Sequence, residues 1–192
     1  MALVTKMGDV EREASKVVKQ QINHVSHRHP LEASEVHEDD DRGVCAGCEH
    51  DIVGPAYVCT KPSCNFVLHD LCSDLPRRHR HRCHPGHPLD LLPSPPYSDG
   101  EFTCDACGAS GHGFTYHCAA CKFDLHVECA ALPETVKRSD HQHPFELVMC
   151  EGNMEGRDSV CYGCDDRVAK GGWMYCCLDC KIGLHLACAE TW

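Results

Sequence analysis

Cysteine and histidine recur along this chain at spacings that repeat three times. Each copy carries two closely spaced cysteine pairs, then a histidine that follows one cysteine by five positions and precedes another by three. The copies span Cys45 to Cys72, Cys104 to Cys129 and Cys161 to Cys188. Self-similarity at a fixed period is the signature of a repeat architecture. We therefore predict three copies of a unit of just under 60 residues, filling the chain from about residue 29 onward.

Apolar burial alone is a weak source of order for this chain. Leu, Ile, Val and Phe together are fewer than one residue in five, and the net charge is −11. That composition is close to the composition of disordered proteins. The 18 cysteines offer another source of order, as disulfides or as metal ligands.

The compartment favours metal over disulfides. The first residues contain no uninterrupted apolar segment of the kind found in a signal peptide, and no run of about 20 apolar residues occurs anywhere. We therefore expect a reduced chain that is cytoplasmic and/or nuclear and not secreted. In such a compartment, dense Cys and His at fixed spacing indicate zinc.

Each spacing has a physical reason. In C-x2-C, a tight turn lets two thiolates converge on one tetrahedral ion while amides of the turn donate to the sulfurs. In H-x2-C, the offset of three positions puts both side chains on one face of a helical turn. One such pair is weak evidence, but the same order in three copies, with C-x4-C replacing the second pair in the first copy, is strong evidence for zinc.

Two tetrahedral sites per repeat need eight ligands, and the repeated core supplies six. His29, His87 and His143 each open a His-Pro-Leu or His-Pro-Phe triplet, 16 to 18 positions before the first C-x2-C. His84 and His141 each follow the last cysteine of a repeat by 12 positions. Each repeat can therefore be read as H…C-x2-C…C-x2-C…H-x2-C…H.

The segment RHRHRCHPGHPLDLL, residues 78–92, is read by the same rule as a joint between repeats. His84 closes the first repeat and His87 opens the second. His79, His81 and Cys83 are left without a role as ligands.

This order of ligands resembles the zinc finger of protein kinase C conserved region one, in the divergent form found in plant cysteine/histidine/proline-rich proteins. The hallmark HPL…CxxC…YxCxxCxFxLHxxC is nearly complete in residues 87–130, and the resemblance covers about 160 of the 192 residues. It implies cross-braced ligation of two zinc ions per repeat, five to six per chain.

The ligand sets follow from this resemblance. In the first repeat they are Cys45, Cys48, His69 and Cys72, then His29, Cys59, Cys64 and His84. In the second repeat they are Cys104, Cys107, His126 and Cys129, then His87, Cys118, Cys121 and His141. In the third repeat they are Cys161, Cys164, His185 and Cys188, then only His143, Cys177 and Cys180.

The second site of the third repeat is one ligand short on this assignment. By the 12-residue rule the missing ligand would fall beyond Trp192. Cys150 is the nearest spare ligand, and Cys176 is less suitable because it occupies the place of Val58 and His117 in the other repeats. The site could be completed from elsewhere, stay empty, or hold a reactive zinc with an open position, as catalytic zinc does.

The predicted fold is three tandem, cross-braced, treble-clef-like modules of the small α+β class, organised by zinc. Each has short antiparallel strands and one short helix beginning near H-x2-C, with a core formed by Tyr116, Phe123, Leu125 and Leu132 and their equivalents. The expected boundaries are 1–28 for an N-terminal segment, 29–84, 87–141 and 143–192. Within the first segment, the spacing of Val10, Ala14, Val17 and Val18 favours a helix over residues 7–22.

Four classes of function remain. The resemblance implies a non-enzymatic module that binds protein partners, in proteins associated with plant stress, hormone and defence signalling. The parent family also binds diacylglycerol between two apolar loops, and only the third repeat, with Trp173 and Met174, offers apolar side chains there.

Two further classes have less support. The acidic charge makes nucleic-acid binding unlikely, apart from a local cluster at Arg77, Arg78, Arg80 and Arg82. The other class is a zinc- or thiol-dependent enzyme. An oxidoreductase would need C-x2-C pairs that are not committed to metal. A ubiquitin ligase would need a finger of the plant-homeodomain type that opens at Cys45 and closes with Cys104 and Cys107, which would leave the second repeat unable to close. The sequence leaves the oligomeric state open.

Overall fold

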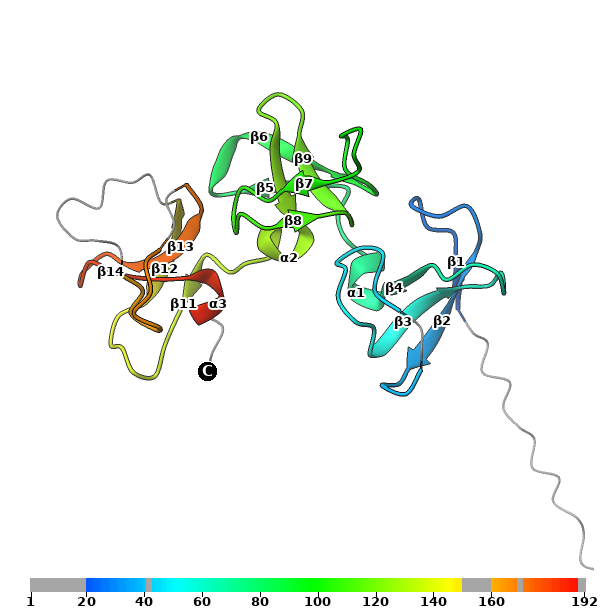
Figure 1. Cartoon of the computed structure of the whole chain (residues 1–192), viewed down its shortest axis with the longest axis horizontal. Coiled ribbons are helices and arrows are strands. Elements are labelled where there is room, and N and C mark those ends of the chain that lie inside the picture. Colours follow the sequence, from blue (N-terminus) through cyan, green and yellow to red (C-terminus); the bar gives the residue numbers. More distant parts are fainter. Residues whose placement is uncertain (1–19, 41–42, 150–159, 169–170, 190–192) are drawn as a thin grey trace, which may run out of the picture.

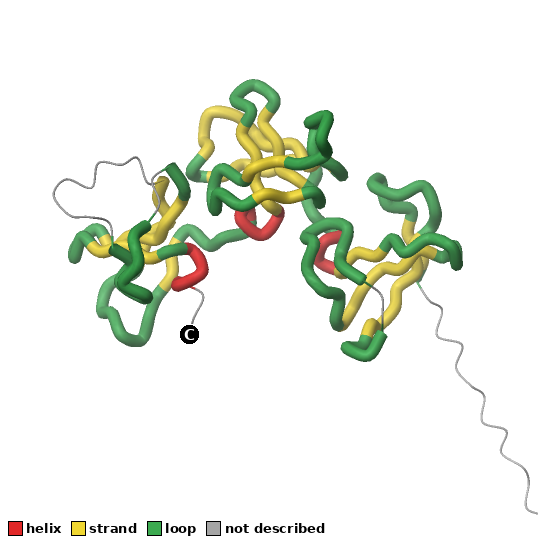
Figure 2. The backbone as a smooth tube through the Cα atoms, viewed as in Figure 1, coloured by secondary structure: helices red, strands yellow, loops and turns green. Residues whose placement is uncertain are grey.

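The computed structural model describes residues 20–40, 43–149, 160–168 and 171–189. They form three small units that follow one another along the chain, with the second unit between the first and the third (Figure 1). Figure 2 shows that each unit consists of short strands, one helical turn and long connecting loops. The predicted class of small zinc-finger-like α+β modules is confirmed.

The three modules share an order of four strands followed by a helix, and the second module has an additional pair of short strands. The first contains β1 (Gln21–Ile22), β2 (Leu31–Val36), β3 (Gly54–Cys59), β4 (Val67–His69) and α1 (Asp70–Ser73). The second contains β5 (Arg78–His81), β6 (His84–Leu92), β7 (Phe102–Thr103), β8 (Ser110–Gly111), β9 (Thr115–Cys118), β10 (Phe123–His126) and α2 (Val127–Ala130). The third contains β11 (Thr135–Val136), β12 (Phe145–Met149), β13 (Trp173–Cys177), β14 (Ile182–Leu184) and α3 (Leu186–Ala189).

Each module is built on a four-stranded antiparallel sheet with the same topology. The strand orders are β1-β2-β3-β4, β5-β6-β9-β10 and β11-β12-β13-β14. Each helix follows directly after the histidine of H-x2-C, as the sequence predicts. The last two strands of each sheet form a hairpin, and the second cysteine pair spans the last residue of its first strand and the turn that follows.

A tyrosine and a leucine face each other in the same register in every hairpin. The pairs are Tyr57 with Leu68, Tyr116 with Leu125, and Tyr175 with Leu184. All six side chains are buried, as are Phe123 and the strand residues Leu31 and Phe145. The predicted core is therefore confirmed for Tyr116, Phe123 and Leu125, whereas Leu132 is partly buried at its edge.

The boundaries between modules lie earlier than the expected ones. Strand β5 pairs with β6 in the second sheet, and β11 pairs with β12 in the third. The Tyr116 hydroxyl also donates to the carbonyl of Pro76 (2.8 Å), as the Tyr175 hydroxyl does to that of Pro133 (2.7 Å). The segment just after each helix is thus already part of the next module, so the expected ends at residues 84 and 141 are too late.

Only the last three residues of the helix expected over residues 7–22 are described by the structure. Residues 7–19 of the expected helix lie outside the described residues. At its end, Gln21 and Ile22 form strand β1, which pairs with Glu32 and Leu31 of β2. The edge of the first sheet takes up these residues, so the helix does not extend to residue 22.

Candidate metal centres

Two kinds of Cys/His group occur in every module. The first kind joins the first C-x2-C to the H-x2-C at the start of the helix. Its members are Cys45, Cys48, His69 and Cys72, then Cys104, Cys107, His126 and Cys129, with the same arrangement at Cys161, Cys164, His185 and Cys188. These groups match the ligand sets expected from the sequence.

The turn between the two cysteines of the first pair has one backbone conformation in all three modules. The residue just after the pair is Glu49, Gly108 or Asp165, with φ of 62°, 75° and 61°. Its amide donates to the carbonyl of the first cysteine, at 2.9, 2.8 and 2.9 Å. This turn, which we call the knuckle, brings the two sulfurs to the same side.

Histidine orientation in the first kind of site is fixed by the backbone. The Nδ1 atoms of His69, His126 and His185 lie 3.3, 3.4 and 3.4 Å from the sulfur of the second knuckle cysteine. Each Nε2 lies 3.1 to 3.2 Å from a backbone carbonyl. A proton on Nε2 therefore leaves the Nδ1 lone pair aimed at the sulfurs, as metal-ligating histidines require.

The first cysteine of the knuckle is prepared to be a thiolate. A hydrogen bond from the Cys72 thiol, assisted by backbone amides, lowers the pKa of Cys45 to about 4 against the opposing effect of burial. The equivalent bond from Cys129 lowers the pKa of Cys104 to about 3. Thiolate is the form of cysteine that binds metal.

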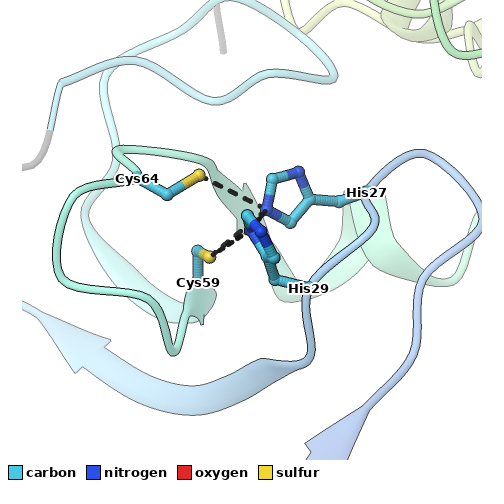
Figure 3. A group of neighbouring side chains, drawn as sticks. All are labelled: His27, His29, Cys59 and Cys64. Atoms are coloured by element: carbon cyan, nitrogen blue, oxygen red, sulfur yellow. Dashed lines mark hydrogen bonds between the residues drawn. The ribbon is translucent and has the colours of Figure 1, made fainter.

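The second kind of group joins two histidines from the start of a module to the second cysteine pair. Figure 3 shows the first of them, His27, His29, Cys59 and Cys64. His27 Nε2 lies 3.2 Å from the sulfur of Cys59 and 3.4 Å from that of Cys64, and His29 Nδ1 lies 3.5 Å from Cys59. The edges of a tetrahedral zinc site with two nitrogen and two sulfur ligands are roughly 3.4 to 3.8 Å long.

The other two modules repeat this group. It consists of His84, His87, Cys118 and Cys121 in the second module and of His141, His143, Cys177 and Cys180 in the third. Nδ1 of His87 lies 3.2 Å from Cys121, and Nδ1 of His143 lies 3.3 Å from Cys180. The Nε2 atoms of His84 and His141 are buried without a hydrogen-bond partner among the described residues. These orphaned nitrogens fit a metal ion, which would be their missing partner.

The structure corrects the expected grouping of two histidines. His84 joins the second module and does not close the first, and His141 joins the third module and does not close the second. His27, which the sequence interpretation left out, takes the vacated place in the first module. The physical reason is strand pairing: β6 carries both His84 and His87 and runs beside β9, whose last residue is Cys118.

The same correction completes the third module. His141 supplies the fourth ligand, so neither Cys150 nor Cys176 is needed. Cys176 is buried within β13, and Cys150 lies outside the described residues. Each of the six groups then has four ligand atoms.

The sequence contains a signal for the histidine pairs of the second kind of group, but the period of the repeat alone could not assign each pair to a module. His27 and His141 each stand two positions before the histidine of the His-Pro pair, and His84 stands three before it. In a tandem repeat, a ligand at a boundary recurs at a similar offset from the repeat before it and from the repeat after it. The 12-position offset from the preceding cysteine therefore could not show which repeat His84 and His141 belong to.

The remaining candidates in residues 78–92 have packing roles. His81 is buried, its ring stacks on Trp173 at 4.3 Å, and its Nδ1 accepts a hydrogen bond from the Cys83 amide. His79 contacts the ring of Tyr116. Both histidines are thus in contact with aromatic rings.

The apolar pair Trp173 and Met174 is buried, and part of the arginine cluster is paired with carboxylates. Trp173 and Met174 are 3% and 1% exposed, so they form no apolar tip that could enter a membrane. In the arginine cluster, Arg78 pairs with Asp90 at 2.9 Å and Arg82 with Glu146 at 3.2 Å. No helix among the described residues is long and apolar enough to span a lipid bilayer.

Comparison with known proteins agrees with this grouping. A family model described as "C1 domain" matches residues 25–73, 82–130 and 139–189. Each matched region begins two residues before the first histidine of a module, namely His27, His84 and His141. All three matched regions are zinc-finger-like, and none is a catalytic domain.

Among curated proteins, the chain is similar to "Probable nucleoredoxin 1" of Arabidopsis thaliana, with 33% identity over 91 residues. The match covers 44% of this chain and only 15% of that protein. No solved structure was found that matches the chain significantly. The family model covers most of the chain in three consecutive copies, and the chain belongs to the C1 domain family.

Proposed function

We propose that this protein is a non-enzymatic scaffold that binds protein partners, each of its modules held together by two zinc ions. The observation that carries the proposal is the completeness of the six Cys/His groups. Each offers four ligand atoms, so a bound zinc would be coordinatively saturated by protein. Saturated tetrahedral zinc is structural, whereas catalytic zinc keeps an open position.

Zinc would supply most of the folding free energy of each module. The cores are small, and a structural zinc contributes about 10 to 16 kcal/mol of apparent binding free energy coupled to folding. The surface that remains for function is the one that the modules present to other molecules. By family resemblance we assign it to protein partners in plant stress, hormone or defence signalling.

Charge supports protein partners over nucleic acid. The net charge is −11, and thiolate ligation leaves a zinc-loaded chain acidic as well. Two of the four clustered arginines, Arg78 and Arg82, are paired with carboxylates. A mobility-shift titration at low salt should therefore show no saturable binding to DNA or RNA.

Zinc content and thiol reactivity test the proposal together. Elemental analysis should give six zinc ions per chain, and a thiol reagent should label at most Cys83, Cys150 and Cys176 rapidly until a chelator is added. Chelation should expose the other cysteines and unfold the modules, seen as loss of amide dispersion by NMR. A zinc-loaded protein with many reactive thiols, or one that catalyses disulfide reduction, would contradict the proposal.

A groove in the first module supports lipid binding as a second candidate. It has a volume of about 450 Å³ and is lined by Val44, Val58, Val67 and Pro62 together with Lys61, Asn65 and the candidate ligands Cys59 and Cys64. Val44 is 54% exposed. Co-sedimentation with liposomes, with and without diacylglycerol, tests this candidate, and a Val44→Glu change should abolish any binding that is specific to the groove.

A further inference from the structure

Consecutive modules are joined twice in the same way. The amide of Phe114 donates to the carbonyl of Gly47 (2.9 Å), and the amide of Trp173 donates to the carbonyl of Ala106 (2.7 Å). Gly47 and Ala106 are the third residues of the knuckles Cys45–Cys48 and Cys104–Cys107. Phe114 and Trp173 each stand two positions before the core tyrosine of the following module. A zinc knuckle of one module is thus the docking point for the next.

The residue before each aromatic has to be glycine because the two backbones approach closely. A Cβ on Gly113 would lie 2.5 Å from the Gly47 carbonyl oxygen, and one on Gly172 would lie 2.9 Å from that of Ala106. We call the Gly–aromatic pair the plug and the knuckle that receives it the socket. In this chain, Gly113–Phe114 and Gly172–Trp173 are the plugs.

In the third module, the side chains beneath the knuckle glycine are arranged as they are in an occupied socket. A Cβ on Gly163 would lie 3.1 Å from Cys188 Cβ and 3.4 Å from Leu184 Cδ2. The matching distances at Gly47 are 3.2 Å to Cys72 Cβ and 3.4 Å to Leu68 Cδ2, with the Phe114 ring as a third neighbour at 3.4 Å. The two sites therefore differ by the aromatic ring.

Exposure shows the same difference. Gly47 and Ala106 are buried under the following module, whereas Gly163 is exposed and its neighbour Tyr162 is 42% exposed. Among the described residues, none donates a hydrogen bond to the Gly163 carbonyl. Among the described residues, the third socket thus has the Gly163 carbonyl as acceptor and the Cys188 and Leu184 side chains beneath it, and it lacks a plug.

A second copy of this chain does not offer a matching plug from its first module. The equivalent pair, two positions before Tyr57, is Gly54–Pro55. Proline has no amide hydrogen to donate and no aromatic ring. The other two plugs are already seated within the chain. The occupant that fits is therefore a C1-type module with a complete Gly–aromatic plug, and it is none of the three modules described here.

We propose that the knuckle Cys161–Cys164 is a docking socket for a C1-type zinc module of another protein, which inserts a Gly–aromatic plug against Gly163. This inference rests on the proposed protein-binding function and names the class of partner. Two internal joints of the same construction support it. The short connections between modules hold each internal plug near its socket at an effective concentration in the millimolar range, an advantage that a partner in trans lacks, so we expect weak binding with Kd on the order of 0.1 to 1 mM.

The test supplies the missing plug by substitution. Pro55→Phe gives the first module an amide hydrogen and an aromatic ring at the plug position. Space is available there because Pro55 is exposed, and a Cβ on the preceding Gly54 would meet only the Glu35 carboxylate, at 4.0 Å. A second change, Gly163→Glu, blocks the socket of the same molecule, so that the double variant is a plug-only probe that cannot self-associate.

The unlabelled plug-only probe is titrated to millimolar concentration into ¹⁵N-labelled, zinc-loaded wild-type protein. We expect saturable shifts of the amides of residues 161–164. Labelled Gly163→Ala should respond equally, because alanine already occupies this position in the second module, and labelled Gly163→Glu should not respond. A Pro55→Ala version of the probe, which restores the amide without the ring, should bind at least tenfold more weakly.

Two results would overturn the proposal. One is the absence of shifts at residues 161–164 with folded, zinc-loaded samples; the other is the same shifts on addition of unlabelled wild-type protein, which would make the occupant a second copy. Zinc content is measured on every sample. Six zinc ions with an unresponsive socket would remove this inference and leave the proposed function standing, whereas missing zinc or reactive knuckle thiols would count against the proposed function.

Discussion

At the scale of single residues, the Nε2 atom of His84 gives the clearest indication of a bound zinc ion. It is buried and has no hydrogen-bond partner among the described residues, while the ring stacks on Phe123 at 4.4 Å. A buried polar atom without a partner costs about 1 to 3 kcal/mol. Burial also lowers the pKa of His84, which favours the neutral imidazole. A neutral nitrogen beside two cysteine sulfurs is what a zinc ion requires.

Replacing His84 or His27 tests which module each residue serves. His84→Ala should release one zinc of six and broaden the amide signals of the second module, and His27→Ala should do the same to the first. His84→Cys should keep six zinc ions, because cysteine is also a zinc ligand. His37→Ala, at an exposed position, is the control. The grouping would be wrong if His84→Ala disturbed Cys59 and Cys64 in place of Cys118 and Cys121.

Asp124 is a second residue whose surroundings explain its burial. It is 3% exposed in β10, accepts a hydrogen bond from the Tyr97 hydroxyl and lies 2.8 Å from His117 Nδ1. Its own amide donates to Asp105 at 2.7 Å. The hydrogen bond to Asp124 is the main cause that raises the pKa of Tyr97 to about 12. The second module therefore has a polar network that pins the loop after β6 to the hairpin.

Tyr97→Phe should destabilise the second module by about 1 kcal/mol at neutral pH, because Asp124 loses a donor. The folded pKa of Tyr97 lies above the usual value of about 10, so the hydroxyl stabilises the fold below pH 10, and this contribution is lost as the pH rises from 10 to 12. Urea denaturation followed by second-module amides measures the difference. Tyr162→Phe is the control, because among the described residues the Tyr162 hydroxyl makes only a long, exposed hydrogen bond of 3.3 Å to the Asp140 carbonyl and contacts no carboxylate. A constant Tyr97→Phe effect up to pH 12 would refute the assignment.

At the scale of elements, β13 has two roles at once. Its pairing with β12 and β14 builds the third sheet, and its first residue, Trp173, enters the second module. The indole stacks on His81 at 4.3 Å and lies 6.4 Å from Phe123, whose ring covers His84. One strand thus connects the core of one module to the metal centre of its neighbour.

Trp173→Ala should cost about 3 to 5 kcal/mol, the usual loss for a buried aromatic, and should release the third module from the second. Trp173→Phe should cost under about 1.5 kcal/mol, because the indole Nε1 has no hydrogen-bond partner among the described residues and phenylalanine fills the same place at Phe114. Urea midpoints of third-module amides, with the His81 ring signals, measure both effects. Equal losses in the two variants would show that the ring is not seated as described.

At the scale of the whole molecule, the three modules are held by short connections and by the two plug-and-socket joints. Across the first joint, the His112 amide also donates to the Glu49 carboxylate at 2.8 Å, and His50 lies 3.3 Å from Glu128. Across the second, Arg82 reaches Glu146. Because each module has its own metal ligands, a joint can open without loss of zinc.

Gly113→Ala should open the first joint, since the added Cβ would meet the Gly47 carbonyl oxygen at 2.5 Å. We expect a larger radius of gyration by small-angle scattering and new mobility of the first module by NMR relaxation, with six zinc ions retained. Gly86→Ala is the matched control, because a Cβ there meets nothing within 4 Å. An unchanged scattering profile for Gly113→Ala would mean that the joint does not hold the modules together.

The sequence by itself determined the local chemistry of this protein. C-x2-C and H-x2-C fix ligand geometry within a few residues, so the period, the fold class and the three knuckle sites could be read from spacing. The Tyr–Leu core could be read as well, because hydrophobic residues recur at the same places in each hairpin. Each of these features depends on contacts between residues close in the chain.

Only the tertiary structure decided to which module's metal group His84 and His141 belong, and which residues form the contacts between modules. His84 lies 12 positions after one cysteine and 34 before another, and spacing cannot choose between them in a periodic chain. The pairing of β6 with β9 does choose, because it carries His84 to Cys118 and Cys121. In the same way, the sequence left Trp173 open as a packing residue or as an aromatic at a loop tip, and its backbone contact with Ala106 places it inside a joint.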